Sequence, residues 1–150
     1  VGVEMVRLKP QRSEDPQRRK QQQQQQQQLT ALTLREVGGA MMSAWDAWYE
    51  NAAALIFVAD TSSLAALAAA AAEFYAAISA PALAHKPTLL VLGKRDVAGA
   101  VDIEVARRIL RLGELQAGTR GKGGLTVCEA SAAAPASVLE WLDELRGILP

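Results

Sequence analysis

The 150-residue sequence predicts an α/β fold with a mostly parallel sheet and helices on both of its faces. Two observations predict this class. Short, continuously apolar runs at residues 53–59 and 88–92 are typical of strands buried on both faces of a sheet. Helical segments separate these runs from each other and from a later strand, and strands that alternate with helices form parallel sheets. The length suits one domain with a real core.

The composition excludes several classes of protein. Lys plus Arg and Asp plus Glu are equal at 16 each, and the mild basic excess of residues 1–28 is too weak to indicate nucleic-acid binding. The single cysteine, Cys128, excludes a disulfide framework, and a reducing, cytoplasmic compartment fits best. No apolar run is long enough to predict a transmembrane segment. These features favour a cytoplasmic domain that does not bind nucleic acid.

The beginning of the chain combines a strand pattern with a low-complexity tract. Residues 3–8 alternate apolar and charged side chains, which is typical of a half-exposed strand. Residues 9–28 are polar, contain two prolines and end in eight consecutive glutamines. Such a tract cannot bury enough apolar area to offset the entropy lost on ordering. We interpret residues 9–28 as a disordered polyglutamine insertion without a site of its own.

The next segments enter the predicted sheet. Residues 29–36 predict a strand, and residues 41–51 predict a short helix. The large rings of this helix, which we expect in the core, are those of Trp45, Trp48 and Tyr49.

The first buried strand, at residues 53–59, ends at Asp60. Thr61 or Ser62 is the expected N-cap of the following helix, which reaches about Ser79.

The second half of the chain repeats the alternation. Residues 88–92 predict a buried strand, Asp102 begins a helix, and the glycine-rich residues 113–124 predict a loop. Residues 125–129 predict a short strand and residues 136–149 an amphipathic helix. The apolar residues expected on the inward faces of these two helices are Ile103, Ala106, Ile109 and Leu110 in the first, and Val138, Leu139, Leu142, Leu145 and Leu149 in the second.

The candidate site follows from the sheet, because ligands of open parallel sheets bind beyond the carboxyl ends of the strands. The segments at these ends are Glu36-Val37-Gly38-Gly39, Asp60, Gly93-Lys94-Arg95-Asp96 and Glu129-Ala130-Ser131-Ala132.

The first segment pairs an acidic residue with glycines. The Glu36 carboxylate can hold a Mg²⁺-bound water, and the N–H of Gly39 can approach a terminal phosphate. Taken alone, the segment is equally well explained as a turn in which glycine supplies a positive φ.

The later segments offer groups that could recognise a base. Asp96 can accept two hydrogen bonds from a guanine edge, while the stem of Lys94 covers the base. Ser131 and Ala132 can offer a backbone N–H to a base oxygen. An ordinary strand–helix loop with solvated charges, and a plain helix entry, are the alternatives for these two segments.

In this order and at these strand ends, the segments resemble the acidic-x-x-Gly, Lys-x-Asp and Ser-Ala boxes of guanine-nucleotide-binding domains. The chain resembles the Arf-like branch of the small GTPases, in which an Asp-Val-Gly-Gly box precedes a Trp and an aromatic pair. The resemblance covers nearly everything except residues 9–28. It implies the three-layer Ras-like P-loop GTPase fold and a switch that binds GTP or GDP with Mg²⁺. It further implies effector or regulatory proteins that bind near Trp48 and Tyr49, and a location at the periphery of membranes.

The sequence departs from the family pattern at three positions. Glu36 replaces the box Asp, and Gly93 replaces the Asn of the Asn-Lys-x-Asp box. Ala40 stands where many Arf proteins have the glutamine that orients the attacking water, and a methyl group cannot do this. We therefore assign no catalytic residue and expect slow GTP hydrolysis.

No Gly-x-x-x-x-Gly-Lys-Ser/Thr run is present, and the spacing of residues 118–124 (GTRGKGG) is wrong for one. The resemblance implies that the first strand, the phosphate loop and the first helix precede Val1, so that residues 1–150 are a partial GTPase domain. Without that strand, the strands at residues 32–35 and 54–59 expose unpaired edges. We expect these 150 residues alone to be poorly stable and to bind nucleotide weakly or not at all. The alternative function is a protein-interaction scaffold with a degenerate GTPase fold, and a flavodoxin-like redox protein is a more distant one.

Overall fold

The computed structural model describes residues 4–7, 32–118 and 123–149. Of these residues, those within Val1–Trp45 and Asp143–Pro150 form one compact unit, and those within Asp46–Leu142 form another. The predicted polyglutamine insertion at residues 9–28 lies outside the described residues.

The first unit contains an antiparallel pair of strands. β1 (Glu4–Arg7) pairs with β2 (Thr33–Glu36). Both lie within the strands predicted at residues 3–8 and 29–36. A 3₁₀-helix, η1 (Gly39–Ala44), follows and ends beside Trp45, whose Nε1 donates to the Gly38 carbonyl oxygen at 3.4 Å.

The helix predicted over residues 41–51 is instead divided between η1 and the single turn α2 (Asp46–Tyr49), which belongs to the second unit. The prediction that Trp45, Trp48 and Tyr49 are core residues is wrong, because all three are half-buried. Two helices of six and four residues offer too little continuous surface to enclose three large rings.

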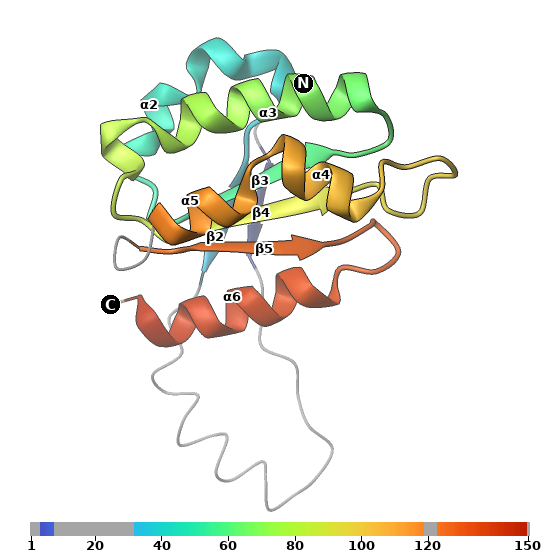
Figure 1. The fold of residues 1–150 in the computed structure, drawn as a ribbon. Helices are drawn as coiled ribbons and strands as arrows, with labels where there is room; N and C mark the ends of the chain where they lie inside the picture. Colours follow the sequence, from blue (N-terminus) through green and yellow to red (C-terminus); the bar gives the residue numbers. More distant parts are fainter. Residues whose placement is uncertain (1–3, 8–31, 119–122, 150) are drawn as a thin grey trace, which may run out of the picture. The chain divides into compact units, whose positions relative to one another are not determined.

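The second unit contains the predicted parallel sheet (Figure 1). Its strands are β3 (Leu55–Asp60), β4 (Thr88–Gly93) and β5 (Leu125–Glu129), in the order β3-β4-β5. Every residue of the central strand β4 is buried, as its continuous apolar pattern predicts.

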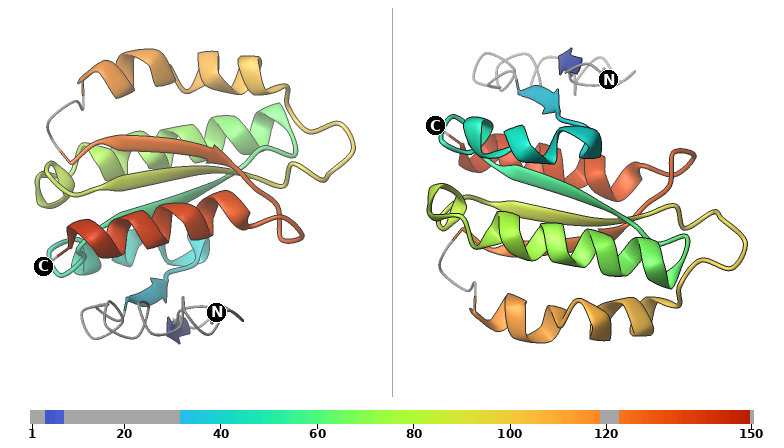
Figure 2. Two further views of the ribbon diagram at one scale, coloured as in Figure 1. Left: turned by 90° about the horizontal axis from the view of Figure 1, so that it is seen from below. Right: turned by 90° about the horizontal axis from the view of Figure 1, so that it is seen from above.

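Helices cover this sheet on both faces (Figure 2). The helices α3 (Leu64–Ile78), α4 (Ile103–Ile109) and α5 (Leu112–Gly118) lie on one face. On the other face lies α6 (Ala136–Ile148), as far as it belongs to this unit. The predicted α/β layering is therefore confirmed. Phe74 of α3 is fully buried against Phe57 of β3, with 5.2 Å between the ring centroids.

The prediction that the first buried strand is covered on both faces is wrong. Among the described residues β3 pairs only with β4, and Val58 is 65% exposed. Phe57 and Ala59 are buried, and Phe57 packs on α3. The alternate face of β3 carries Val58. An apolar run therefore does not show whether both faces of a strand are covered.

Two helix boundaries also differ from the prediction. The N-cap of α3 is Ser63, whose side chain accepts from the Ala66 N–H, rather than Thr61 or Ser62. The loop predicted at residues 113–124 begins with α5 instead. Its helix period places the buried Leu112 and the half-buried Leu115 three residues apart, and this outweighs the cost of its glycines.

The inward faces of α4 and α6 also differ from the prediction. Ile109 is 38% exposed and Leu139 is 42% exposed, whereas Trp141 is buried. The predicted inward faces of α4 and α6 were too wide, because the sheet covers only part of the surface of each helix.

Candidate functional site

The carboxyl ends of the three parallel strands are aligned at one edge of the sheet. Asp60, the last residue of β3, is in register with Gly93, and Leu92 is in register with Glu129, the last residue of β5. The segments that follow the three strands therefore begin at the same edge, where ligands of parallel sheets bind.

Thr61 and Gly93 join the ends of β3 and β4. The Thr61 hydroxyl donates to the Gly93 carbonyl oxygen at 2.6 Å, and the Thr61 N–H donates to the same oxygen at 3.2 Å. A Cβ atom on Gly93 would lie 3.2 Å from Cγ1 of Val58 and 3.3 Å from the Ala59 carbonyl oxygen. A side chain at this position would therefore be in tight contact with β3.

Lys94 begins the loop after β4 with a φ of 60°. Its Nζ lies 2.6 Å from Oδ2 of Asp60, whose Oδ1 accepts from the Ser62 N–H at 2.9 Å. The hydrogen bond from Lys94, followed by the bonds from Ser62, lowers the pKa of Asp60 from 3.8 to about 2. Asp60 therefore stays ionised and binds the ammonium group of Lys94 at the end of β3.

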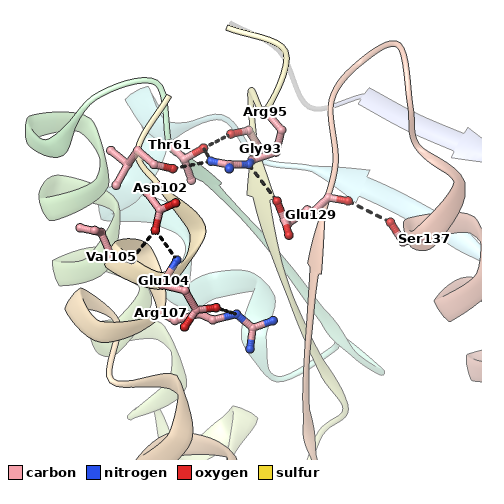
Figure 3. Close-up of polar contacts among 10 residues, drawn as sticks. Thr61, Gly93, Arg95, Asp102, Glu104, Val105, Arg107, Glu129 and Ser137 are labelled. Carbon is pink, nitrogen blue, oxygen red and sulfur yellow. Dashed lines mark hydrogen bonds and ion pairs between the residues drawn. The ribbon is translucent and has the colours of Figure 1, made fainter. Parts of the chain in front are cut away.

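The Arg95 side chain lies between the ends of all three strands (Figure 3). One terminal nitrogen, NH1, donates to Oγ1 of Thr61 at 3.3 Å and to the Val101 carbonyl oxygen at 2.6 Å. Nε donates to Oε2 of Glu129 at 3.0 Å. The loops at this edge are consequently joined by one guanidinium.

The structure brings together five of the predicted site residues: Gly93, Lys94, Asp96, Ser131 and Ala132. The loop after β4 contacts the loop after β5 through the Arg95 N–H and the Ala130 carbonyl oxygen at 3.5 Å. Asp96 is exposed, as base recognition would require.

Ser131 and Ala132 begin a tight turn after β5. The Ser131 N–H donates to the Ala134 carbonyl oxygen at 3.5 Å, and the Ala134 N–H donates to the Ser131 carbonyl oxygen at 3.1 Å. Ala132, at the tip of this turn, is exposed. Of the two predicted N–H donors, that of Ala132 is therefore the better placed for a ligand.

Glu36 and Gly39 belong to the first unit and are therefore described separately. Glu36 is the exposed last residue of β2, and Gly39 begins η1. Neither Gly38 nor Gly39 has a positive φ, so the turn alternative does not explain these glycines. A Cβ on Gly39 would meet nothing within 4 Å, so the space beside its backbone is open. Ala40 is exposed as well.

The sequence patterns did not identify Arg95, Thr61 or Glu129 as parts of one network. Arg95 is only 22% exposed, although an arginine in a strand–helix loop ordinarily indicates solvated charge. In the sequence, these three residues were recognisable only by their positions beside predicted strand ends. Those positions did not specify their hydrogen-bond partners.

Two findings concern metals and membranes. In the described ranges, no group of three or more His, Cys, Asp or Glu side chains could hold a metal ion. Nor does any helix in these ranges have the length and apolar character needed to cross a bilayer.

Comparisons with known proteins agree with this geometry. The sequence model of the ADP-ribosylation factor family matches residues 3–147. Human ADP-ribosylation factor-like protein 16 is 32% identical over 114 residues, which are 74% of this chain and 57% of that protein. The chain therefore spans somewhat more than half of the length of this relative.

A solved structure is similar as well. It is the Arl6 BBS3 small GTPase from Trypanosoma brucei with the bound nucleotide analogue GppNp. The TM-score is 0.70 and the identity 22%, over 98% of this chain and 80% of that one. This likeness supports the Ras-like fold. Because the family model matches nearly the whole sequence, the chain belongs to the ADP-ribosylation factor family of small GTPases.

Proposed function

We propose that this chain carries the base-recognition half of a guanine-nucleotide-dependent switch. The observation that supports this most is the contact between the loops after β4 and β5, through Arg95 N–H and the Ala130 carbonyl oxygen. Asp96 and Ala132 therefore lie on loops that meet at the carboxyl edge of the sheet, which supports the proposed roles of acceptor and donor. A guanine base offers two donors and one acceptor along the matching edge.

The proposed roles follow from hydrogen-bonding chemistry. The Asp96 carboxylate accepts from the ring N–H and the exocyclic amino group of guanine. The Ala132 N–H donates to the base oxygen, and the Lys94 stem, held by Asp60, covers the base plane. Adenine presents an amino group where guanine has its oxygen, so the Ala132 N–H has no acceptor there.

Two residues of the first unit are proposed to contact Mg²⁺ and the terminal phosphate. Glu36 would bind Mg²⁺ through a water, and the Gly39 N–H would approach the terminal phosphate. Loops held by the phosphate and Mg²⁺ are released after hydrolysis, which changes the surface offered to effectors. We assign effector or regulator binding to the half-buried rings of Trp48 and Tyr49.

The activity of these 150 residues is expected to be low. They contain no phosphate-loop motif, so the phosphates lack their main backbone cradle and affinity is weaker than micromolar. Ala40 cannot orient an attacking water, so intrinsic GTP hydrolysis is slow. Micromolar or tighter affinity for GDP, or fast single-turnover hydrolysis, would contradict these two expectations.

The decisive test replaces the base-reading carboxylate. In an Asp96→Asn variant the side-chain amide donates where the carboxylate accepted, and xanthine has an oxygen where guanine has its amino group. We expect the unchanged chain to show GDP-dependent NMR shifts at Lys94, Asp96 and Ala132, and the variant to prefer XDP to GDP. Asp143→Asn, at an exposed acid on α6, removes the same charge and should leave the preference for GDP unchanged.

A second candidate is a protein-interaction scaffold that has lost nucleotide binding. It is favoured by the departures at Glu36, Ala40 and Gly93, and by the engagement of Lys94 and Arg95 in ion pairs within the chain. If millimolar GDP, GTP, XDP and ADP all leave the loop resonances unshifted, the scaffold replaces the switch as the better proposal.

A further inference from the structure

We infer that Arg95 is a positioning residue for base recognition, because its guanidinium sets the spacing between the two loops that carry Asp96 and Ala132. This inference rests on the proposed function for its base-binding part. The loop-joining part stands on the geometry alone. Gly93, which has no side chain, cannot make such a connection, whereas Arg95, two residues later, reaches three different segments.

Thr61 connects Arg95 to the end of β4. Its hydroxyl has one proton, which the bond to the Gly93 carbonyl oxygen uses at 2.6 Å. A lone pair of the same oxygen therefore accepts from NH1 of Arg95 at 3.3 Å. Thr61 is fully buried, so water does not compete for either bond. Arg95 is thus connected through Thr61 to the backbone of its own loop and to the end of β3.

Arg95 is also bonded to the end of β5. Nε of Arg95 lies 3.0 Å from Oε2 of Glu129, which immediately precedes the turn containing Ser131 and Ala132. The Glu129 carbonyl oxygen accepts from the Ser137 hydroxyl of α6 at 2.9 Å, so the residue before the turn is bonded to the helix after it (Figure 3). Arg95 therefore contacts the residue at which this turn is closed.

Arg95 is further bonded to the segment before α4. The same NH1 donates to the Val101 carbonyl oxygen at 2.6 Å, and the Val101 N–H donates to the Thr61 carbonyl oxygen at 2.9 Å. The loop that contains Asp96 is therefore fixed both where it leaves β4 and where it enters α4. Asp96 lies between these two fixed points, and its place at the sheet edge depends on them.

Only arginine satisfies this arrangement. A guanidinium has five N–H donors in a rigid plane, so it can reach acceptors in divergent directions at once. A lysine at this position keeps the charge but offers one compact ammonium, which cannot occupy the positions of both NH1 and Nε. Arg95→Lys therefore separates the effect of geometry from the effect of charge.

The first measurement is hydrogen exchange of the unliganded 150-residue chain. In Arg95→Gln and Arg95→Lys we expect amides of residues 94–97 and 130–132, which follow β4 and β5, to exchange about tenfold faster, the factor that hydrogen bonds to a charged group contribute. Arg107→Gln is the matched control, because Arg107 is 48% exposed and its ion pair, at 3.9 Å, is with Glu104 of its own helix. Exchange within β4 should be unchanged in all variants, which excludes general unfolding as the cause.

The second measurement compares GDP with IDP, whose base lacks the 2-amino group that Asp96 reads. We expect Arg95→Gln and Arg95→Lys to lower the ratio of GDP to IDP affinity about threefold to tenfold in NMR titrations, because a misplaced carboxylate loses part of this hydrogen bond. A purely structural loss weakens both nucleotides equally and leaves the ratio unchanged, which would overturn the base-positioning role.

The two measurements also separate this inference from the proposed function. Unchanged exchange in both loops of both Arg95 variants overturns the loop-joining role, whatever the nucleotide data are. If the unchanged chain binds no guanine nucleotide, the proposed function fails and the base-positioning role fails with it. Faster exchange in the same two loops then still establishes that Arg95 joins them.

Discussion

Replacement of Thr61 by valine tests the polar network at the sheet edge with a nearly isosteric change. Valine fills the same volume but cannot donate to the Gly93 carbonyl oxygen or accept from Arg95. Thr61 is fully buried, so no water replaces the lost hydroxyl.

The magnitude follows from the partners that remain. The Gly93 carbonyl oxygen keeps the Thr61 N–H at 3.2 Å, and NH1 of Arg95 keeps the Val101 carbonyl oxygen at 2.6 Å. Neither group is therefore left without any partner, and the full desolvation penalty does not apply. The loss is one short neutral hydrogen bond and one longer bond to a charged donor, which together give about 2 kcal/mol in the free energy of unfolding.

Urea unfolding followed by tryptophan fluorescence measures this change. We expect the midpoint to fall by about 1 M with an unchanged slope, since the native and unfolded surfaces are the same. Thr126→Val is the control, because Thr126 is exposed on β5 and its replacement should change the free energy by less than about 0.5 kcal/mol. A Thr61→Val chain as stable as this control would refute the hydrogen-bond assignment. Thr61→Ser, which keeps the hydroxyl, should recover most of the lost stability.

Four other substitutions give separate tests of the structure. Ser63→Ala removes the N-cap of α3 and should lower the free energy of unfolding by about 1 kcal/mol in urea; no change would mean that another residue caps the helix. The pKa of Asp60, measured by NMR of its carboxyl carbon, should be about 2 and should rise towards 3.8 in Lys94→Met. Because the folded-state pKa is the lower one, the stabilisation from this pair is complete above about pH 4 and disappears as the pH falls towards 2. Gly123→Ala should destabilise the fold by more than about 1 kcal/mol, since φ is +82° and the new Cβ would lie 2.6 Å from a backbone carbonyl oxygen. Gly113→Ala, in open space on α5, should instead raise the stability by about 0.5 to 1 kcal/mol; equal effects at the two glycines would contradict this reasoning.

Much of the second unit was predictable from local patterns. The runs at residues 88–92 and 125–129 gave β4 and β5 nearly to the residue, because each is a short segment rich in strand-forming residues that begins directly after Pro87 or a glycine. The N-cap of α4 was also correct. Asp102 accepts from the Glu104 and Val105 N–H groups. A cap interacts with its own first turn, so the information lies within four residues.

The errors occurred where exposure depends on distant segments. The apolar sequence of β3 did not predict that Val58 is 65% exposed, since this depends on which segments cover that face of the sheet. Leu139 of α6 was predicted to face inward but is 42% exposed, and the buried Trp141 was not among the predicted inward residues. The α5 helix was missed because glycines outweighed a weak apolar spacing in a short segment.

The sequence by itself determined the family and the positions of the candidate boxes. Order and strand-end placement sufficed for this, because a parallel sheet brings the carboxyl ends of its strands to one edge whatever the details of packing are. Only the tertiary structure decided how that edge is held together. The bonds that join Arg95 to Thr61 and Glu129 connect residues 34 positions apart in the chain. Their existence depends on strand register and on burial of the guanidinium, and neither is encoded in the neighbouring residues.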